Sequence, residues 1–252
     1  TEDSRNLTVE RITDETEATR GLLQHLLADG GCAGVVCNTV RRAQELFQAL
    51  QADFPGEIEL HHRRFLAPER AARAASLVRR LGRDGIERPH RLVVIGTQVL
   101  EQSLDIDFDV LVSDLAPIDL VLQRAGRLHR HERGSRPRRV ASPVLFLRGV
   151  QDWDACPPRA VRGSRSVYGE ASLLRSAAVL AGRATVLLPS GIPSLVREGY
   201  DDALAPPTGW EGVWADSEAV ARVEAASKRS RAASYLIDSP LKRSTLIGWI
   251  DV

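Results

Sequence analysis

The sequence predicts an α/β protein: a parallel sheet flanked by helices, followed by a mainly helical extension. Up to about residue 146, short runs rich in Val and Ile alternate with segments of helical spacing. The longest apolar runs lack polar alternation, which is typical of strands covered on both faces. After Gly149 this alternation stops and proline and glycine become frequent. We therefore expect a sheet domain at residues 1–150, a mainly helical linker extension at 151–236, and the start of an incomplete C-terminal region at 237–252.

The apolar runs predict strands at residues 34–38, 57–60, 91–97, 109–115, 143–149 and 246–252. Helical spacing predicts helices at about 40–50, 68–81, 119–126, 166–183 and 216–236. Thr39 is suited to cap the first helix, while Pro68 and Gly82 mark the beginning and the end of the second. Because ligands of such sheets gather beyond the carboxyl ends of the strands, the residues that follow each strand are the first candidates for a site.

The composition argues against several classes of protein. The 252 residues include 43% hydrophobic and 27% charged positions, as in a globular protein, and no apolar run is long enough to cross a membrane. The first residues are too polar for a signal peptide, so we expect a cytoplasmic protein with no membrane partner. Three cysteines form no CxxC pair, which argues against a disulfide framework or a cysteine zinc site. Because the chain contains no methionine, we expect it to be a fragment.

The most basic stretch, QRAGRLHRHERGSRPRR at 123–139, is a candidate phosphate site. It contains seven arginines and one acid, although the formal net charge of the whole chain is only +1. Fixed guanidinium groups stabilise the charge that develops on phosphoryl oxygens. If the preceding helix continues through Arg130, then Gln123, Arg127 and Arg130 share one helical face, whereas Arg124 points elsewhere. The alternative is a solvated basic patch.

The segment 96–117 supplies hydroxyl and carboxylate groups ahead of this stretch. Gly96 and Thr97 end a predicted strand, and their amide and hydroxyl groups suit a backbone phosphate of a nucleic acid strand. Four acids follow, namely Glu101, Asp105, Asp107 and Asp109. A carboxylate near the arginines would bind ribose hydroxyls or hold the arginines in position, whereas an isolated acid is more often a loop or cap residue.

Two motifs in these segments resemble those of a known family. TQVLEQSLDIDFD at 97–109, followed by QRAGRLHR at 123–130, resembles the fifth and sixth conserved motifs of superfamily 2 helicases, and in detail those of the CRISPR-associated helicase-nuclease of type I interference systems. Upstream, CNTVRRAQELFQAL at 37–50 resembles the fourth motif, and LHHRRF at 60–65 resembles the His-x-Arg-Phe element of that family.

The resemblance implies that residues 1–150 are the second RecA-like domain of a helicase motor. It implies that Arg127 and Arg130 are catalytic arginine fingers, which reach the terminal phosphate of ATP bound between two RecA-like domains. In the same way, Gln123 would contact this phosphate end of ATP and Asp105 would face the nucleotide sugar.

The resemblance also implies a path for single-stranded DNA lined by Thr39, Arg64 and Thr97, with Arg124 bracing the sixth motif internally. Further partners that it implies are the CRISPR surveillance (Cascade) complex and the N-terminal nuclease and first helicase domains, which are missing from this chain.

The sequence lacks the phosphate loop of a complete motor. Such a loop ends in Gly-Lys-Ser/Thr, but the only lysines, Lys228 and Lys242, do not follow a glycine. ATP and Mg²⁺ would therefore be bound mainly by the missing first RecA-like domain, with no cofactor held tightly by this chain. Asp114 ends an apolar strand, but without the loop we do not expect it to bind magnesium. We expect no metal site at His129 and His131, which we interpret as surface residues.

We therefore expect the C-terminal motor half of an ATP-dependent helicase or translocase for single-stranded DNA, which works with a nuclease in CRISPR interference and is not an active ATPase alone. Two alternatives stay open. One is a superfamily 2 RNA or DNA helicase domain of another family, which shares the fold and the arginine fingers. The other is a non-catalytic nucleic-acid-binding or docking module.

Overall fold

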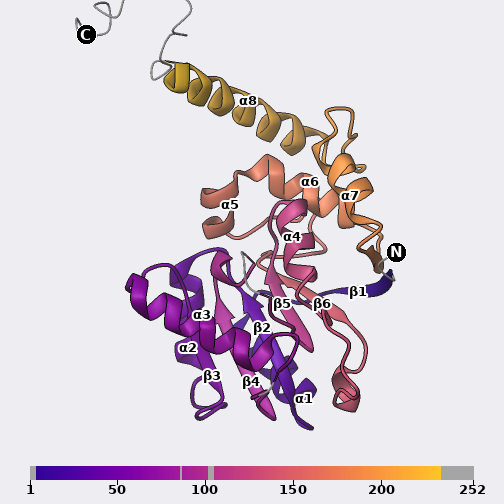
Figure 1. Ribbon diagram of the computed structural model, residues 1–252. Coiled ribbons are helices and arrows are strands. Elements are labelled where there is room, and N and C mark those ends of the chain that lie inside the picture. Colours follow the sequence, from indigo (N-terminus) through magenta and orange to yellow (C-terminus); the bar gives the residue numbers. More distant parts are fainter. Residues whose placement is uncertain (1–3, 86, 102–104, 234–252) are drawn as a thin grey trace, which may run out of the picture.

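A seven-stranded sheet with the strand order β3-β4-β2-β5-β6-β1-β7 forms the centre of the computed structural model (Figure 1). The structure describes residues 4–85, 87–101 and 105–233, so the strand predicted at 246–252 and the C-terminal region predicted at 237–252 lie outside the described residues. Neighbouring strands pair in parallel, except for the antiparallel pair of β1 and β7. The strands are β1 (Arg5–Arg11), β2 (Gly31–Val36), β3 (Ile58–His61), β4 (Arg91–Gly96), β5 (Val110–Asp114), β6 (Val144–Arg148) and β7 (Thr185–Leu188).

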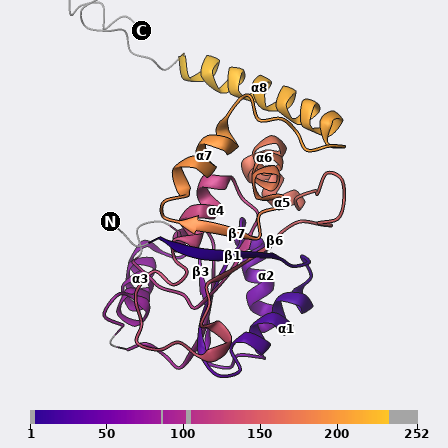
Figure 2. The same ribbon diagram turned by 90° about the vertical axis from the view of Figure 1, so that its right-hand side faces the viewer.

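Helices cover both faces of this sheet, and the predicted α/β fold class is confirmed. Figure 2 shows α1 and α2 on one side of the sheet and α3 on the other. The α-helices are α1 (Thr16–Leu26), α2 (Val40–Leu50), α3 (Ala67–Leu81), α4 (Ile118–Ala125), α5 (Arg162–Tyr168), α6 (Glu170–Leu180), α7 (Ile192–Tyr200) and α8 (Glu211–Ala233).

Strand β2 shows why the apolar runs lack polar alternation. Its residues Cys32 and Val36 belong to a core formed with α3, α4 and α6. Its residues Ala33 and Val35 belong to a second core, formed with α1 and α2. Successive side chains of a strand point to opposite faces of the sheet, so a strand that is covered on both sides must be apolar at nearly every position.

Local signals set the ends of two helices as predicted. Thr39 caps α2, because its Oγ1 accepts a hydrogen bond from the backbone N of Arg42 at 3.2 Å. Pro68 lies in the first turn of α3, where its missing N–H costs no helical hydrogen bond, and Gly82 follows the last turn.

Four elements, β1, α1, β7 and α7, were not predicted from the sequence. Strand β1 has the sequence RNLTVER and is mostly polar, and its partners β6 and β7 come from much later in the chain. Pairing between distant segments leaves no local pattern. Strand β7 forms the edge of the sheet although it follows residue 150, so the extension completes the sheet; the division of the chain at residue 150 stays a prediction.

The helix predicted at 166–183 is two helices. Gly169 separates α5 from α6 with a φ of 80°, in the left-handed region that glycine adopts more readily than other residues. The chain therefore changes direction where the periodic pattern suggested one continuous element.

The helix that precedes the basic stretch does not continue through Arg130, because α4 ends at Ala125. Beyond it, the backbone pairs with Phe108 instead of forming further helical turns. Phe108 N donates to the carbonyl of Arg127 at 2.8 Å, and His129 N donates to the carbonyl of Phe108 at 2.9 Å. Gln123, Arg127 and Arg130 are therefore not on one continuous helical face, and that expectation is wrong.

The extension packs beside the sheet through a smaller core. Trp210 and Trp214 lie in this core with apolar residues of α6. Helix α8 extends away from the sheet, and its buried residues, Trp214 and Ser217, lie in its first turns (Figure 1). In the described ranges, no helix has the length and apolar character that a membrane span requires.

Replacing Gly34 by alanine is expected to destabilise the chain. A Cβ at this position of β2 would lie 2.7 Å from the ring of Phe108, which is fully buried, so the ring or the strand would have to shift. We expect the free energy of unfolding to fall by about 1–3 kcal/mol, as measured by denaturant unfolding. In Gly21→Ala the new Cβ meets nothing within 4 Å in the middle of α1, so this control should gain about 0.5–1 kcal/mol. Equal stability of the two variants would contradict the close approach.

Candidate functional site

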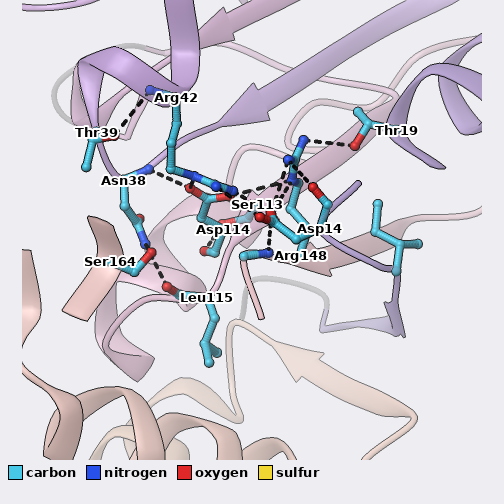
Figure 3. A network of polar contacts seen from close by, with 12 residues as sticks. Asp14, Thr19, Asn38, Thr39, Arg42, Ser113, Asp114, Leu115, Arg148 and Ser164 are labelled. Carbon is cyan, nitrogen blue, oxygen red and sulfur yellow. Dashed lines mark hydrogen bonds and ion pairs between the residues drawn. The ribbon is translucent and has the colours of Figure 1, made fainter. Parts of the chain in front are cut away.

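The candidate site is built at the carboxyl ends of β2, β4 and β5, as expected for a parallel sheet. Asn38 and Thr97 come shortly after the first two strands, and Asp114 is the last residue of β5. Figure 3 shows the backbone N of Asn38 facing Asp114, where it donates to Oδ2 at 2.9 Å. Polar residues of separate segments are therefore joined at this edge.

Arg124 is a buried cation at the centre of the site. Its Nε donates to Glu101 Oε2 at 2.6 Å, and both side chains are 0% exposed. Its Nη1 donates to Asn38 Oδ1 at 3.1 Å, and to Ser113 Oγ and the Asp114 carbonyl, both at 3.0 Å. A buried charge is tolerated when it is paired and fully hydrogen bonded. Arg124 thus braces the site from inside, as expected.

Asp114 is a buried anion that joins three segments (Figure 3). Arg42 donates to both of its oxygens, from Nε at 2.9 Å and from Nη2 at 2.8 Å. Arg42 and Arg148 also bind Asp14, which lies in the loop after β1. Burial by itself would raise the pKa of Asp114, but the hydrogen bonds and the charge of Arg42 hold it below its ordinary value. The carboxylate is therefore committed to structural ion pairs.

The two predicted arginine fingers contact the segment that follows β4. Arg127 Nη2 donates to the Glu101 carbonyl at 2.9 Å, and Arg130 Nε donates to Asp105 Oδ1 at 2.6 Å. Asp105 thus holds an arginine in position, which was one of the two roles expected for an acid here. Gln123 is exposed on α4, one turn before Arg127. The structure brings Arg127, Arg130 and Asp105 together at one segment, with Gln123 on the adjoining helix.

Arg127 has no carboxylate partner within the described residues, unlike the other buried and half-buried arginines of the basic stretch. Its Nε is buried and has no hydrogen-bond partner in the described part of the chain. Burial and the nearby charge of Arg130 lower the pKa of the Arg127 guanidinium, although it stays protonated at neutral pH. A half-buried cation with an unused donor fits an incoming anionic group such as a phosphate.

Asp107 and Asp109 bind Arg133 and Arg136 of the basic stretch. Asp107 Oδ2 accepts hydrogen bonds from Arg133 Nε at 2.8 Å and from Arg136 Nη2 at 3.0 Å. Asp109 pairs with Arg136 and also accepts from Arg88 Nη2 at 2.7 Å. Arg88 was missed by sequence reasoning, because it lies in a loop outside every motif and no pattern connects it to these acids.

The three residues predicted to line a DNA path follow the carboxyl ends of the neighbouring strands β2, β3 and β4. Arg64 is exposed, whereas Thr39 is half-buried because it caps α2. Thr97 is only 1% exposed, so its hydroxyl does not lie on the surface. The loop of Arg64 is fixed by the ring of His62, which stacks on Phe65 with centroids 4.2 Å apart.

His129 and His131 are not the surface residues that we expected. His129 Nε2 lies 3.1 Å from the carbonyl of Asp109, and the His131 side chain is 10% exposed and lies 3.1 Å from Asp105 Oδ1. Burial lowers the pKa of both imidazoles. Across the described ranges, no group of three or more His, Cys, Asp or Glu residues is arranged to hold a metal ion.

Comparisons with known proteins match this chain to one family. Residues 29–133 match a family model described as the C-terminal part of the CRISPR-associated nuclease/helicase Cas3. The CRISPR-associated nuclease/helicase Cas3 of Streptococcus thermophilus is 35% identical over 260 residues, which cover 99% of this chain and 27% of that protein. The chain thus spans about a quarter of the length of this relative.

Solved structures agree with the sequence comparisons. The crystal structure of T. fusca Cas3 with ATP matches with a TM-score of 0.82 and 33% identity, over 95% of this chain and 28% of that one. A chain from a CRISPR RNA-guided surveillance complex in a pre-nicking state matches with a TM-score of 0.76 and 31% identity, over 94% of this chain and 29% of that one.

Asp114→Asn is expected to lower the free energy of unfolding at pH 7 by about 3–5 kcal/mol, because it removes a buried negative charge and leaves Arg42 and Arg148 to share Asp14. The pKa of the carboxyl is lower in the folded state than in the unfolded state, so its contribution is present at neutral pH and is lost as the pH falls below about 4. Denaturant unfolding of both proteins from pH 7 to pH 3 should show the difference shrinking. A difference that is independent of pH would contradict this role.

Proposed function

Because this chain is a homologue of the C-terminal part of the CRISPR-associated Cas3 nuclease/helicases, we propose that it is the C-terminal motor half of an ATP-dependent helicase or translocase. This motor moves along single-stranded DNA and works with a nuclease in CRISPR interference. The family resemblance of the fifth and sixth motifs is confirmed by these comparisons. The activity of the whole protein is our proposal, since the chain covers 27% of the relative's length.

The observation that carries the proposal is that Arg127 is a half-buried cation with an unused hydrogen-bond donor. It is half-buried, its Nε is unpartnered within the described residues, and its one side-chain hydrogen bond there goes to a backbone carbonyl. In the intact protein the terminal phosphate of ATP completes this arrangement. Donors that are already in place stabilise the charge that develops on a transferred phosphoryl group without reorganising during the reaction.

Three further residues lie near Arg127 and contribute to the proposed contacts with ATP. Arg130 is held by Asp105 but is 40% exposed, so its remaining donors are free to approach the same phosphate. Gln123, exposed on the neighbouring helix, contacts the phosphate end as well. Asp105 is 52% exposed and faces the nucleotide sugar. When bound, ATP with Mg²⁺ supplies the phosphoryl transfer, and the missing first RecA-like domain holds both.

The single-stranded DNA path crosses the carboxyl ends of β2, β3 and β4. Arg64 supplies an exposed cation for a phosphate, and Thr39 a half-buried hydroxyl. Thr97 is buried, so it acts on the strand by shaping the turn after β4 rather than by presenting its hydroxyl. Phosphate contacts of this kind position a strand without reading its sequence.

The partners follow from the same assignment. A structural relative at 31% identity belongs to a CRISPR RNA-guided surveillance complex, and we propose that the intact protein is recruited by such a complex (Cascade) in the cytoplasm. The nuclease and the first RecA-like domain lie outside this chain. Closure of the two motor domains over ATP would bring Arg127 to its phosphate.

The full-length protein is expected to hydrolyse ATP faster with single-stranded DNA than with RNA of the same sequence or with no nucleic acid. This chain alone should be inactive, because the phosphate loop lies elsewhere. Phosphate release measures both. Stimulation by RNA would favour a superfamily 2 RNA helicase of another family, and no hydrolysis under any condition would leave only a nucleic-acid-binding or docking module. Binding by such a module would depend steeply on salt and never on nucleotide.

Arg127→Ala in the full-length protein is expected to lower kcat for ATP by about a thousandfold while affinity for single-stranded DNA stays nearly unchanged. Steady-state hydrolysis and filter binding report the two quantities. Arg139→Ala is the matched control, because Arg139 belongs to the same basic stretch but binds Asp29 at the surface at 3.0 Å. A loss of less than about tenfold at Arg127 would refute its assignment as a finger.

A further inference from the structure

Helix α5 lies in the extension, yet two of its side chains reach the buried centre of the site. We infer that Tyr168 is a positioning residue for Arg127, through which the placement of the extension is transmitted to the ATP end of the site. This inference rests on the function proposed above, since it requires Arg127 to act in turnover. The contacts that support it are Tyr168 with Gln98 and Arg124, and Ser164 with Asn38.

Tyr168 joins the fifth motif to the sixth. Its Oη accepts a hydrogen bond from Gln98 Nε2 at 3.1 Å and lies 3.4 Å from Arg124 Nη2, which also donates to it. Gln98 begins the 3-10 turn after β4, and Arg124 lies in α4. One hydroxyl oxygen therefore bridges the turn and the helix, beside the ion pair of Glu101 with Arg124.

The contacts continue from Arg124 to Arg127 through a single residue. The carboxylate of Glu101 holds Arg124 at 2.6 Å, and the carbonyl of the same residue accepts from Arg127 Nη2 at 2.9 Å. Because the Arg127 side chain has no second hydrogen bond in the described part of the chain, its placement depends on Glu101. A shift of the turn that carries Glu101 would therefore shift Arg127.

A second contact holds α5 at the start of the DNA path. Asn38 Nδ2 donates to Ser164 Oγ at 2.8 Å, as Figure 3 shows, and Ser164 is fully buried. Asn38 also accepts from Arg124 and immediately precedes Thr39. Ser164 and Tyr168 are four residues apart, so they lie on the same face of α5. This face contacts both the ATP end and the DNA end of the site.

The rest of the extension sets where α5 lies. The Tyr168 side chain packs against the core of the sheet and also against the smaller core that contains Trp210 and Trp214. After Gly169 the chain continues into α6, and Arg175 of α6 pairs with Glu218 of α8 at 2.6 Å. Networks of packed and hydrogen-bonded side chains can carry coupling between sites. A displacement of α8 would thus reach Tyr168 through α6.

The test is Tyr168→Phe in the full-length protein, which removes one hydroxyl and keeps the packed ring. We expect kcat of DNA-stimulated ATP hydrolysis to fall by about three- to tenfold, with KM for ATP and affinity for single-stranded DNA changed by less than about twofold. In the Arg127→Ala background the same change should have almost no further effect, because the residue that Tyr168 positions is gone. The control is Tyr200→Phe, which removes a hydroxyl that binds Asp119 at 2.8 Å outside this network.

Equal losses from Tyr168→Phe in both backgrounds would overturn the inference, since they would indicate a general structural role. An unchanged kcat, or a loss that Tyr200→Phe reproduces, would overturn it as well. Thermal unfolding of each variant checks that the proteins are folded at the assay temperature. If the wild-type protein shows no DNA-stimulated hydrolysis, the proposed function and this inference are both refuted. If the wild-type protein is stimulated normally and Tyr168→Phe has the same kcat, only the inference is refuted.

Discussion

The buried ion pair between Arg124 and Glu101 is the constraint on which the site depends. Removing two charges from water costs several kcal/mol for each ion, so the pair depends on further hydrogen bonds; Arg124 has these, whereas Glu101 Oε1 is buried with no partner among the described residues. Arg124 finds these in Asn38, Ser113 and the carbonyl of Asp114, which come from the ends of β2 and β5. The ends of the two strands, α4 and the turn after β4 must therefore hold fixed positions relative to one another.

The positions of the acids decide which arginines of the basic stretch are held in structural ion pairs and which are left to bind a ligand. Arg133 and Arg136 are neutralised by Asp107 and Asp109, and Arg124 by Glu101. These carboxylates are buried and hold the chain in place. Arg127 alone among the buried and half-buried arginines of this stretch binds only a carbonyl within the described residues. Of the seven arginines in this stretch, Arg127 is thus the half-buried one whose charge is left available to a ligand.

The sequence was informative where local rules decide the structure. The apolar runs of β2, β4 and β5 and the cap at Thr39 follow from burial on two faces and from side-chain capping, which short segments encode. The pairing of β1 with β6 and β7 depends on segments far apart in the chain and leaves no periodic signal. In the site, the motifs identified the arginines, but the acid that each arginine binds depends on tertiary contacts.

The end of α4 shows how an apolar contact sets the geometry of the charged site. Leu128 is fully buried and pairs with Phe108, and this backbone pairing ends the helical hydrogen bonds before Arg130. The ring of Phe108 fits against the sheet because residue 34 of β2 is a glycine, whose missing Cβ leaves space for it. Arg127 and Arg130 therefore flank the buried side chain of Leu128 and are turned toward the segment after β4. The glycine at position 34 of the central strand thus makes room for the contact that sets where the two arginines lie.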